Sequence, residues 1–197
     1  IQAWNLIFVA YNALYINYEC NERKKMINKI KVNFSANTNK RIIDILYTTP
    51  GWMFASDTQI KSKTYLDSDC GFIFKSYDNE TPFVNNEILN TYANIIFDTV
   101  NDNSHLKFKI IKRIDWNWYH PGSTTKFHQD VLLDNHYSIL YNLQDNDGGT
   151  EFIINNKNDF YKSNQSEALV FPSKILHRGV APKKDLNRFA LNMVVRL

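Results

Sequence analysis

The stretch 127-FHQDVLLD-134 contains a histidine and an aspartate separated by one residue, His128 and Asp130. On a β-strand, residues two positions apart point to the same face, so both side chains can reach one ion. His177, much later in the chain, offers a second imidazole. Two histidines and one carboxylate form the facial triad that holds non-haem Fe(II) and leaves coordination positions open. The pattern therefore favours a metal site made by His128, Asp130 and His177.

Arg188 follows His177 at a short distance along the chain. A guanidinium in this place suits a bidentate grip on a carboxylate, for which lysine is a poor substitute. The alternative is a solvated arginine at a strand end, and Arg196 is a competing candidate that we expect nearer the end of the same strand. A histidine and aspartate at this spacing also occur by chance. The same two residues followed in order by a Gly-Gly turn, a distal histidine and a trailing arginine occur together by chance far less often.

The composition is that of an ordinary globular protein. The 197 residues suffice for one domain with a full core, and 44% are hydrophobic and 22% charged. The net charge of +3 is too small to argue for nucleic acid. Cys20 and Cys70 cannot form a disulfide framework, and they suit a cytoplasmic compartment. We expect no membrane span, while a removed signal peptide stays open because the chain does not begin with Met.

The first half of the chain has a mixed texture. Ile1 to Tyr18 fits a helix or apolar strands, Glu22 to Ile30 is compatible with a helix, and Val32 to Lys40 resembles a loop. Glu87 to Val100 has apolar residues near helical periodicity, which predicts a helix that packs on a sheet. The remaining expectations are a helix over 41–47, strands over 52–55 and 71–77, and a polar connection over 56–69.

From Leu106 onward the sequence changes to short β-rich runs separated by turns. Closely spaced strands of this kind indicate a sandwich or jelly roll rather than a parallel α/β sheet. The expected class is mainly β with N-terminal helices (α+β), in one domain over 1–197. Within it we expect a supporting region over 1–104 and a β core over 105–197. The predicted strands are 107–114, 126–133, 136–143, 150–154, 167–171, 175–180 and 188–196.

The segment from Trp118 to Leu197 resembles the Fe(II)/2-oxoglutarate-dependent dioxygenases, in particular the branch that contains the prolyl hydroxylases. The resemblance implies a double-stranded β-helix (jelly roll) buttressed by helices, with Fe(II), 2-oxoglutarate and O2, and it allows ascorbate in addition. The motifs that carry it are Tyr119-His120-Pro121-Gly122, His128-Gln129-Asp130, Ser138 to Leu143, Gly148-Gly149-Thr150-Glu151-Phe152, His177 and Arg188.

The resemblance also implies roles for individual residues. His128, Asp130 and His177 become the catalytic iron ligands, and Arg188 becomes the partner of the distal carboxylate of 2-oxoglutarate. The related halogenases lack the carboxylate that Asp130 supplies here, so its presence favours hydroxylation. On the strand 188–196, one face is apolar and the other carries Arg188. Such a strand either separates core from solvent or, as in this family, packs on the helices and lines the site.

Four further residues have weaker expectations. Tyr119 matches a family tyrosine that often hydrogen-bonds the cosubstrate, although aromatic residues are common in cores. Asn142 stands where the family frequently has tyrosine, in a position that often contacts 2-oxoglutarate. Trp116 and Trp118 either line a substrate groove or belong to the core.

The implied reaction is hydroxylation of an unactivated C–H bond, on a prolyl or other peptidyl substrate. A free amino acid or another metabolite is the alternative substrate, and a non-catalytic jelly-roll binding domain is the alternative outside enzymes. Nucleic-acid demethylation is disfavoured, because 188-RFALN-192 does not match the paired-arginine motif of those relatives and the net charge is small. The sequence does not indicate an oligomeric state.

Overall fold

The computed structural model describes residues 26–54, 71–80, 83–121, 125–184 and 187–197. The expectations for Ile1 to Tyr18 and for 56–69 lie outside these residues. The helices are α2 (Ala36–Thr48) and α3 (Glu87–Asn103), and the strands are β1 (Asn28–Lys31), β2 (Met53–Phe54), β3 (Gly71–Asp78), β4 (Phe83–Val84), β5 (Ile110–Tyr119), β6 (His136–Asn142), β7 (Gly149–Ile154), β8 (Lys157–Lys162), β9 (Glu167–Pro172), β10 (Leu176–Val180) and β11 (Arg188–Arg196).

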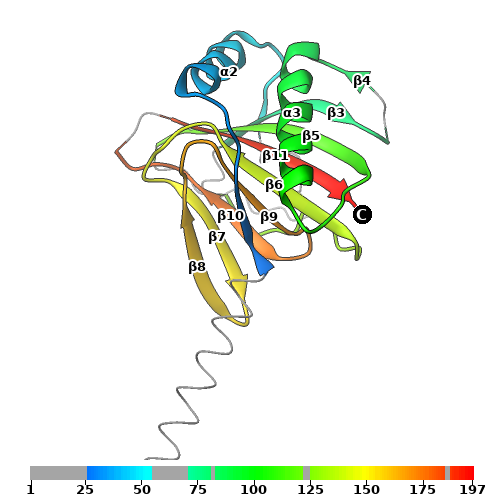
Figure 1. Ribbon diagram of the computed structural model, residues 1–197. Helices are drawn as coiled ribbons and strands as arrows, with labels where there is room; N and C mark the ends of the chain where they lie inside the picture. Colours follow the sequence, from blue (N-terminus) through cyan, green and yellow to red (C-terminus); the bar gives the residue numbers. More distant parts are fainter. Residues whose placement is uncertain (1–25, 55–70, 81–82, 122–124, 185–186) are drawn as a thin grey trace, which may run out of the picture.

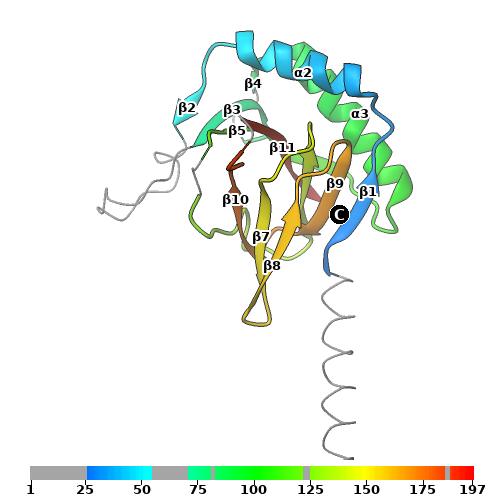
Figure 2. The same cartoon turned by 90° about the vertical axis from the view of Figure 1, so that its left-hand side faces the viewer.

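The strands form two antiparallel sheets. The large sheet has the order β1-β9-β6-β11-β5-β3-β2, with β4 paired to β3, and the small sheet has the order β10-β7-β8. Helices α2 and α3 cover one face of the large sheet, and the small sheet stands at its other face (Figures 1 and 2). Leu140 and Leu169 of the large sheet pack with Phe152 of the small one. This arrangement confirms the jelly roll with supporting helices, while the single-domain organisation stays a prediction.

The alternation of residues along β11 is what connects the helices to the site. Its apolar face is buried in the same core as Leu46 of α2 and Ile96 of α3, and it consists of Phe189, Leu191, Met193 and Val195. Its other face carries Arg188 and Asn192, whose side chains bond to polar groups on the side of the small sheet. One strand therefore supports the core and lines the site, as the resemblance implied.

An N-cap residue fixes where each of the helices α2 and α3 begins. Ser35 caps α2, because its Oγ accepts a hydrogen bond from the backbone N–H of Thr38 at 3.1 Å. The loop predicted over 32–40 is therefore wrong from residue 36. Asn86 caps α3 in the same way, and α3 continues past its predicted end at Val100 to Asn103. Neither described helix is long and apolar enough to cross a membrane.

Three predictions about strands were wrong. The segment 126–133 forms no strand; its one ladder contact is an isolated bridge at His128. Asn28–Lys31 is a strand paired with β9 rather than part of a helix. Strand β8 was missed because most of its residues are polar and exposed. It follows β7 through Asn155 and Asn156, whose φ angles of 51° and 59° suit a tight hairpin turn.

Candidate metal centre

Two backbone hydrogen bonds hold His128 and His177 opposite each other. The N–H of His128 donates to the carbonyl of His177 at 2.8 Å, and the N–H of His177 donates back at 2.9 Å. A third bond, from the N–H of Asp130 to the carbonyl of Ser173 at 3.0 Å, extends the same contact. The short segment before β6 is thereby fastened to β10 and to the turn that precedes it. These backbone bonds hold His128 and Asp130 in place, although the segment does not form the predicted strand.

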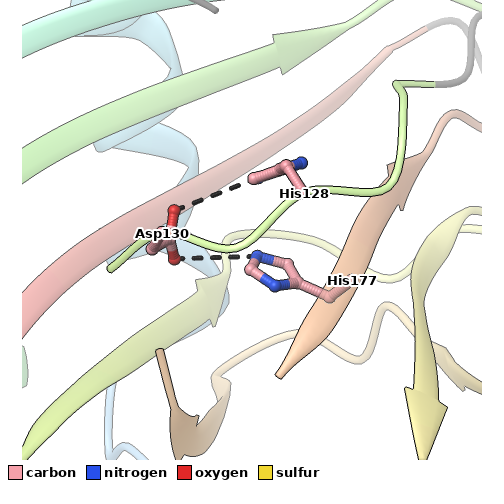
Figure 3. Close-up of side chains that lie close together, drawn as sticks. All are labelled: His128, Asp130 and His177. Carbon is pink, nitrogen blue, oxygen red and sulfur yellow. Dashed lines mark ion pairs between the residues drawn. The ribbon is translucent and has the colours of Figure 1, made fainter. Parts of the chain in front are cut away.

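The three predicted ligands converge. One ligand atom from each of His128, Asp130 and His177 lies within 4.8 Å of the others. The Asp130 carboxylate faces both rings from one side, with Oδ1 3.9 Å from His128 Nε2 and Oδ2 3.6 Å from His177 Nε2 (Figure 3). The side chains of Asp130 and His177 are almost fully buried, while that of His128 is partly exposed. Within the described chain, no other group of histidines, cysteines and acidic residues comes together in this way.

The tautomer of both imidazole rings is set by the backbone. Nδ1 of His128 lies 2.9 Å from the carbonyl oxygen of Lys126, and Nδ1 of His177 lies 2.9 Å from that of Ile175. A carbonyl can only accept, so each Nδ1 donates to it, and in a neutral ring the lone pair is then on Nε2, the nitrogen that faces Asp130. Burial, moreover, lowers the pKa of His177. Three electron-pair donors thus face one point, and a divalent cation fits there.

The Asp130 carboxylate is held by donors from three strands. Ser138 of β6 donates to Oδ2 at 2.6 Å, Arg113 of β5 donates to Oδ1 at 3.2 Å, and Asn192 of β11 lies 3.3 Å from both oxygens. Burial opposes ionisation, but His177, Arg113, His128 and the bond from Ser138 outweigh it and hold the pKa of Asp130 below its ordinary value. The carboxylate is therefore ionised and fixed in one orientation.

A second carboxylate, that of Asp115, contacts the same arginine, Arg113, that contacts Asp130. Oδ2 of Asp115 is 2.5 Å from Nε of Arg113, in an ion pair whose N–H is not aligned as a hydrogen bond. Burial raises the pKa of Asp115 to about 6, against the opposing attraction of Arg113. Burial disfavours the charge on Arg113, but Asp115 and Asp130 together raise its pKa.

Arg188 is fully buried on the same face of the large sheet. Its Nη2 donates to Asn142 Oδ1 at 3.3 Å and to Thr150 Oγ1 at 3.2 Å, and its guanidinium lies 4.8 Å from the ring centre of Tyr119. Its Nε and Nη1 are buried without a hydrogen-bond partner, and no described carboxylate is within ion-pair distance. A buried cation with free donors demands an anion. The free edge fits a carboxylate.

Tyr119 reaches Arg188 because β10 has a glycine beneath it. A Cβ on Gly179 would lie 2.5 Å from both Cζ and Oη of Tyr119. A side chain at residue 179 and the observed position of the tyrosine therefore exclude each other. Burial raises the pKa of Tyr119, although the charge of Arg188 opposes this effect.

The other candidate residues are placed as follows. Asn142 is committed to protein groups: its Oδ1 accepts from Arg188 and from Ser163. Arg196 is exposed at the end of β11. β5 continues beyond its predicted end, and its Trp116 and Trp118 face the core under the helices rather than the metal residues. Neither therefore lines a groove at the metal.

Several residues around the site were not foreseen from the sequence. Asn192 lies on the face of β11 that the resemblance implied would line the site, but its contact with Asp130 was not predicted. Ser138 shares strand parity with Asn142, so the β-period could have placed it on the site face as well. The ion pair of Arg113 with Asp130 had no such signal. It depends on where the 125–130 segment, which is bonded through its backbone to β10 and to Ser173, places the Asp130 carboxylate.

No family model and no curated protein matches the chain. Solved structures do match it. A 2OG-Fe(II) oxygenase family oxidoreductase from Burkholderia pseudomallei has a TM-score of 0.66 at 16% identity, over 92% of this chain and 90% of that one. The prolyl hydroxylase of Trichoplax adhaerens, in complex with a hypoxia inducible factor peptide, has a TM-score of 0.64 at 14% identity, over 90% and 86%.

A third structure is HygX from Streptomyces hygroscopicus, with nickel, 2-oxoglutarate and hygromycin B bound. Its TM-score is 0.61 at 9% identity, over 87% of this chain and 82% of that one. These similarities show the fold. The chain has the jelly-roll fold of the 2OG-Fe(II) oxygenases, and the convergence of the three ligands is an observation on this chain itself.

Proposed function

We propose that this protein is an Fe(II)- and 2-oxoglutarate-dependent oxygenase that hydroxylates an unactivated C–H bond. The observation that carries the proposal is that two imidazole nitrogens and one ionised carboxylate come together at one place. The donor set of His128, Asp130 and His177 is that of the two-histidine, one-carboxylate iron site. The fold supports the same assignment, since solved structures that share it include oxygenases of this class.

Arg188 would hold the distal carboxylate of 2-oxoglutarate. Its unpartnered Nε and Nη1 form the free edge of a buried guanidinium, and Asn142 and Thr150 fix the other edge. Tyr119 packs against the same guanidinium and excludes water from it. Asn142 would act on the cosubstrate through Arg188, because its own amide oxygen is already occupied by protein donors.

Bound Fe(II) would supply oxygen activation: one atom of O2 enters the substrate as a hydroxyl group and the other enters succinate, with loss of CO2 from 2-oxoglutarate. The chain supplies position and charge. The backbone carbonyls of Lys126 and Ile175 keep both imidazoles in the metal-binding tautomer. Ser138 keeps the carboxylate of Asp130 in place.

We propose a peptidyl, in particular prolyl, substrate, supported by the peptide complex of the Trichoplax enzyme. HygX with hygromycin B bound favours the alternative, a small-molecule substrate. The test is succinate formation from 2-oxoglutarate with Fe(II), in the presence of proline-containing peptides or of free amino acids and metabolites. Stimulation by peptides alone supports the peptidyl proposal, and stimulation by metabolites alone contradicts it. Asp130→Ala is the control, and it should form no succinate.

A further inference from the structure

The metal ligand Asp130 is the end of a row of three alternating charges. Arg113 Nη2 contacts its Oδ1 at 3.2 Å, and Arg113 Nε contacts Oδ2 of Asp115 at 2.5 Å. One guanidinium thus spans two carboxylates. The side chains of Asp130 and Asp115 are 3% and 8% exposed, so solvent screens neither of these charges well.

The row is built by β5 and its neighbours. Arg113 and Asp115 are two residues apart on one strand and point to the same face. Asn192, which donates to Asp130, stands directly opposite Asp115 across the strand pair. On the other side, Lys75 of β3 stands opposite Asp115, but its ammonium is bound to Asp78 at 2.8 Å. Among these neighbours, Arg113 is the cation in contact with Asp115.

The net charge of this row determines how strongly the site attracts a divalent cation. The facial triad contributes one negative charge, from Asp130, and Arg113 in contact with that carboxylate offsets it. A divalent cation would then meet a site with no net negative charge. Asp115 restores the net negative charge, because the charges of Asp130, Arg113 and Asp115 add up to one negative charge. Arg113 can therefore orient the ligand carboxylate without repelling the metal, provided that Asp115 is present.

We propose that Asp115 is a positioning residue that sustains metal binding through Arg113, by compensating the guanidinium that orients Asp130. The inference rests on the metal assignment proposed above, and it concerns a carboxylate that touches neither metal nor cosubstrate. It also predicts that Arg113 and Asp115 act as a unit, so that losing both is less harmful than losing the carboxylate alone.

The test uses Mn(II) as the probe, with the full chain and no cosubstrate, by anaerobic calorimetric titration at pH 8. For Asp115→Asn we expect the Kd for Mn(II) to rise about tenfold, the scale of one lost unit charge near a divalent ion at an intermediate dielectric. The double variant Arg113→Gln/Asp115→Asn should return to within about threefold of the wild type, since the net charge is restored. Asp134→Asn removes an equal charge from an exposed ion pair with Lys174, and it should bind Mn(II) as the wild type does.

The rescue separates charge from structure. If Asp115 were merely a packing partner, removing Arg113 as well would weaken binding further. Unchanged affinity in Asp115→Asn, or no recovery in the double variant, would overturn the inference. Asp115→Ser removes the same charge if the Asn variant does not fold. A wild-type protein that binds neither Mn(II) nor Fe(II) would instead overturn the proposed function, so the two failures are distinguishable.

Discussion

His128 and His177 are paired through their backbones, each donating its N–H to the carbonyl of the other, at 2.8 and 2.9 Å. Their ring centroids lie 4.5 Å apart with the ring planes tilted by 50°, and both Nε2 atoms lie toward Asp130. The main chain therefore sets how far apart the backbones of the two proposed ligands lie. The Nδ1 contacts with the carbonyls of Lys126 and Ile175 hold the rings in turn, so a metal ion would meet a site that is already assembled.

Mn(II) should raise the unfolding temperature of the metal-free protein, because a cation satisfies three converging acceptors in the folded state alone. A ligand at 100 times its Kd adds about 2.7 kcal/mol to the free energy of unfolding. The increase should vanish in His177→Ala and persist in His136→Ala, whose histidine lies outside the ligand group. Thermal melts with and without Mn(II) measure it. An equal increase in His177→Ala would contradict the assignment.

Arg188→Ala should weaken 2-oxoglutarate binding by a factor of about 30 or more, since breaking a buried charge pair costs roughly 2 kcal/mol or more. Its affinity for Mn(II) should change little, because Arg188 contacts none of the three ligands. Arg196→Ala is the matched control, on the same strand face but exposed. Titration of the Mn(II)-loaded variants with 2-oxoglutarate measures both. A wild-type affinity in Arg188→Ala would remove the arginine from the site.

Gly179→Ala should displace Tyr119, because the new Cβ would lie 2.5 Å from its Cζ and Oη. Overpacking of this kind lowers the free energy of unfolding by about 1–3 kcal/mol. The affinity for 2-oxoglutarate should fall too, since Tyr119 packs on Arg188. Gly179→Ala/Tyr119→Leu removes the clashing atoms, so it should recover stability but not cosubstrate affinity. Denaturant unfolding measures the stability of both variants. A double variant less stable than Gly179→Ala would contradict the close contact of residue 179 with Tyr119.

Tyr141→Phe should destabilise the scaffold without touching the site. The Tyr141 hydroxyl donates to Asn39 Oδ1 at 2.6 Å, and Asn39 donates to Ser166 at 2.7 Å, which links α2 to the large sheet. Leaving a buried acceptor unsatisfied costs about 1–3 kcal/mol. Tyr137→Phe, on the same strand face, is the control, because its hydroxyl has no hydrogen-bond partner in the described part of the chain. Denaturant unfolding of both variants decides, and equal stability would refute the role of the network.

The sequence was most informative where one residue type carries the chemistry. His128, Asp130 and His177 were predicted from residue type and order, and they do converge. The alternation along β11 likewise predicted which residues share a face, because a period of two leaves few choices, and the family resemblance implied that the apolar face meets the helices.

Prediction failed where tertiary contacts replace local signals. A single bridge at His128 takes the place of a strand over 126–133, since backbone pairing with β10 needs only a few residues. The polar strand β8 lacks the apolar alternation that marks a half-buried strand. Its local signal is the Asn155-Asn156 turn, in which both residues have positive φ angles. The pair of Arg113 with Asp130 joins separate segments of the fold, and no spacing rule predicts it.

The most direct test of the central claim is an anaerobic titration of the metal-free protein with Fe(II) and then 2-oxoglutarate, followed by visible absorption. Chelation of iron by the 2-oxo acid gives a weak charge-transfer band. We predict that the band appears in the wild type, is lost in His128→Ala and survives in His136→Ala. A folded wild-type protein that shows no band with both reagents in excess would contradict the oxygenase assignment and favour a non-catalytic jelly-roll domain.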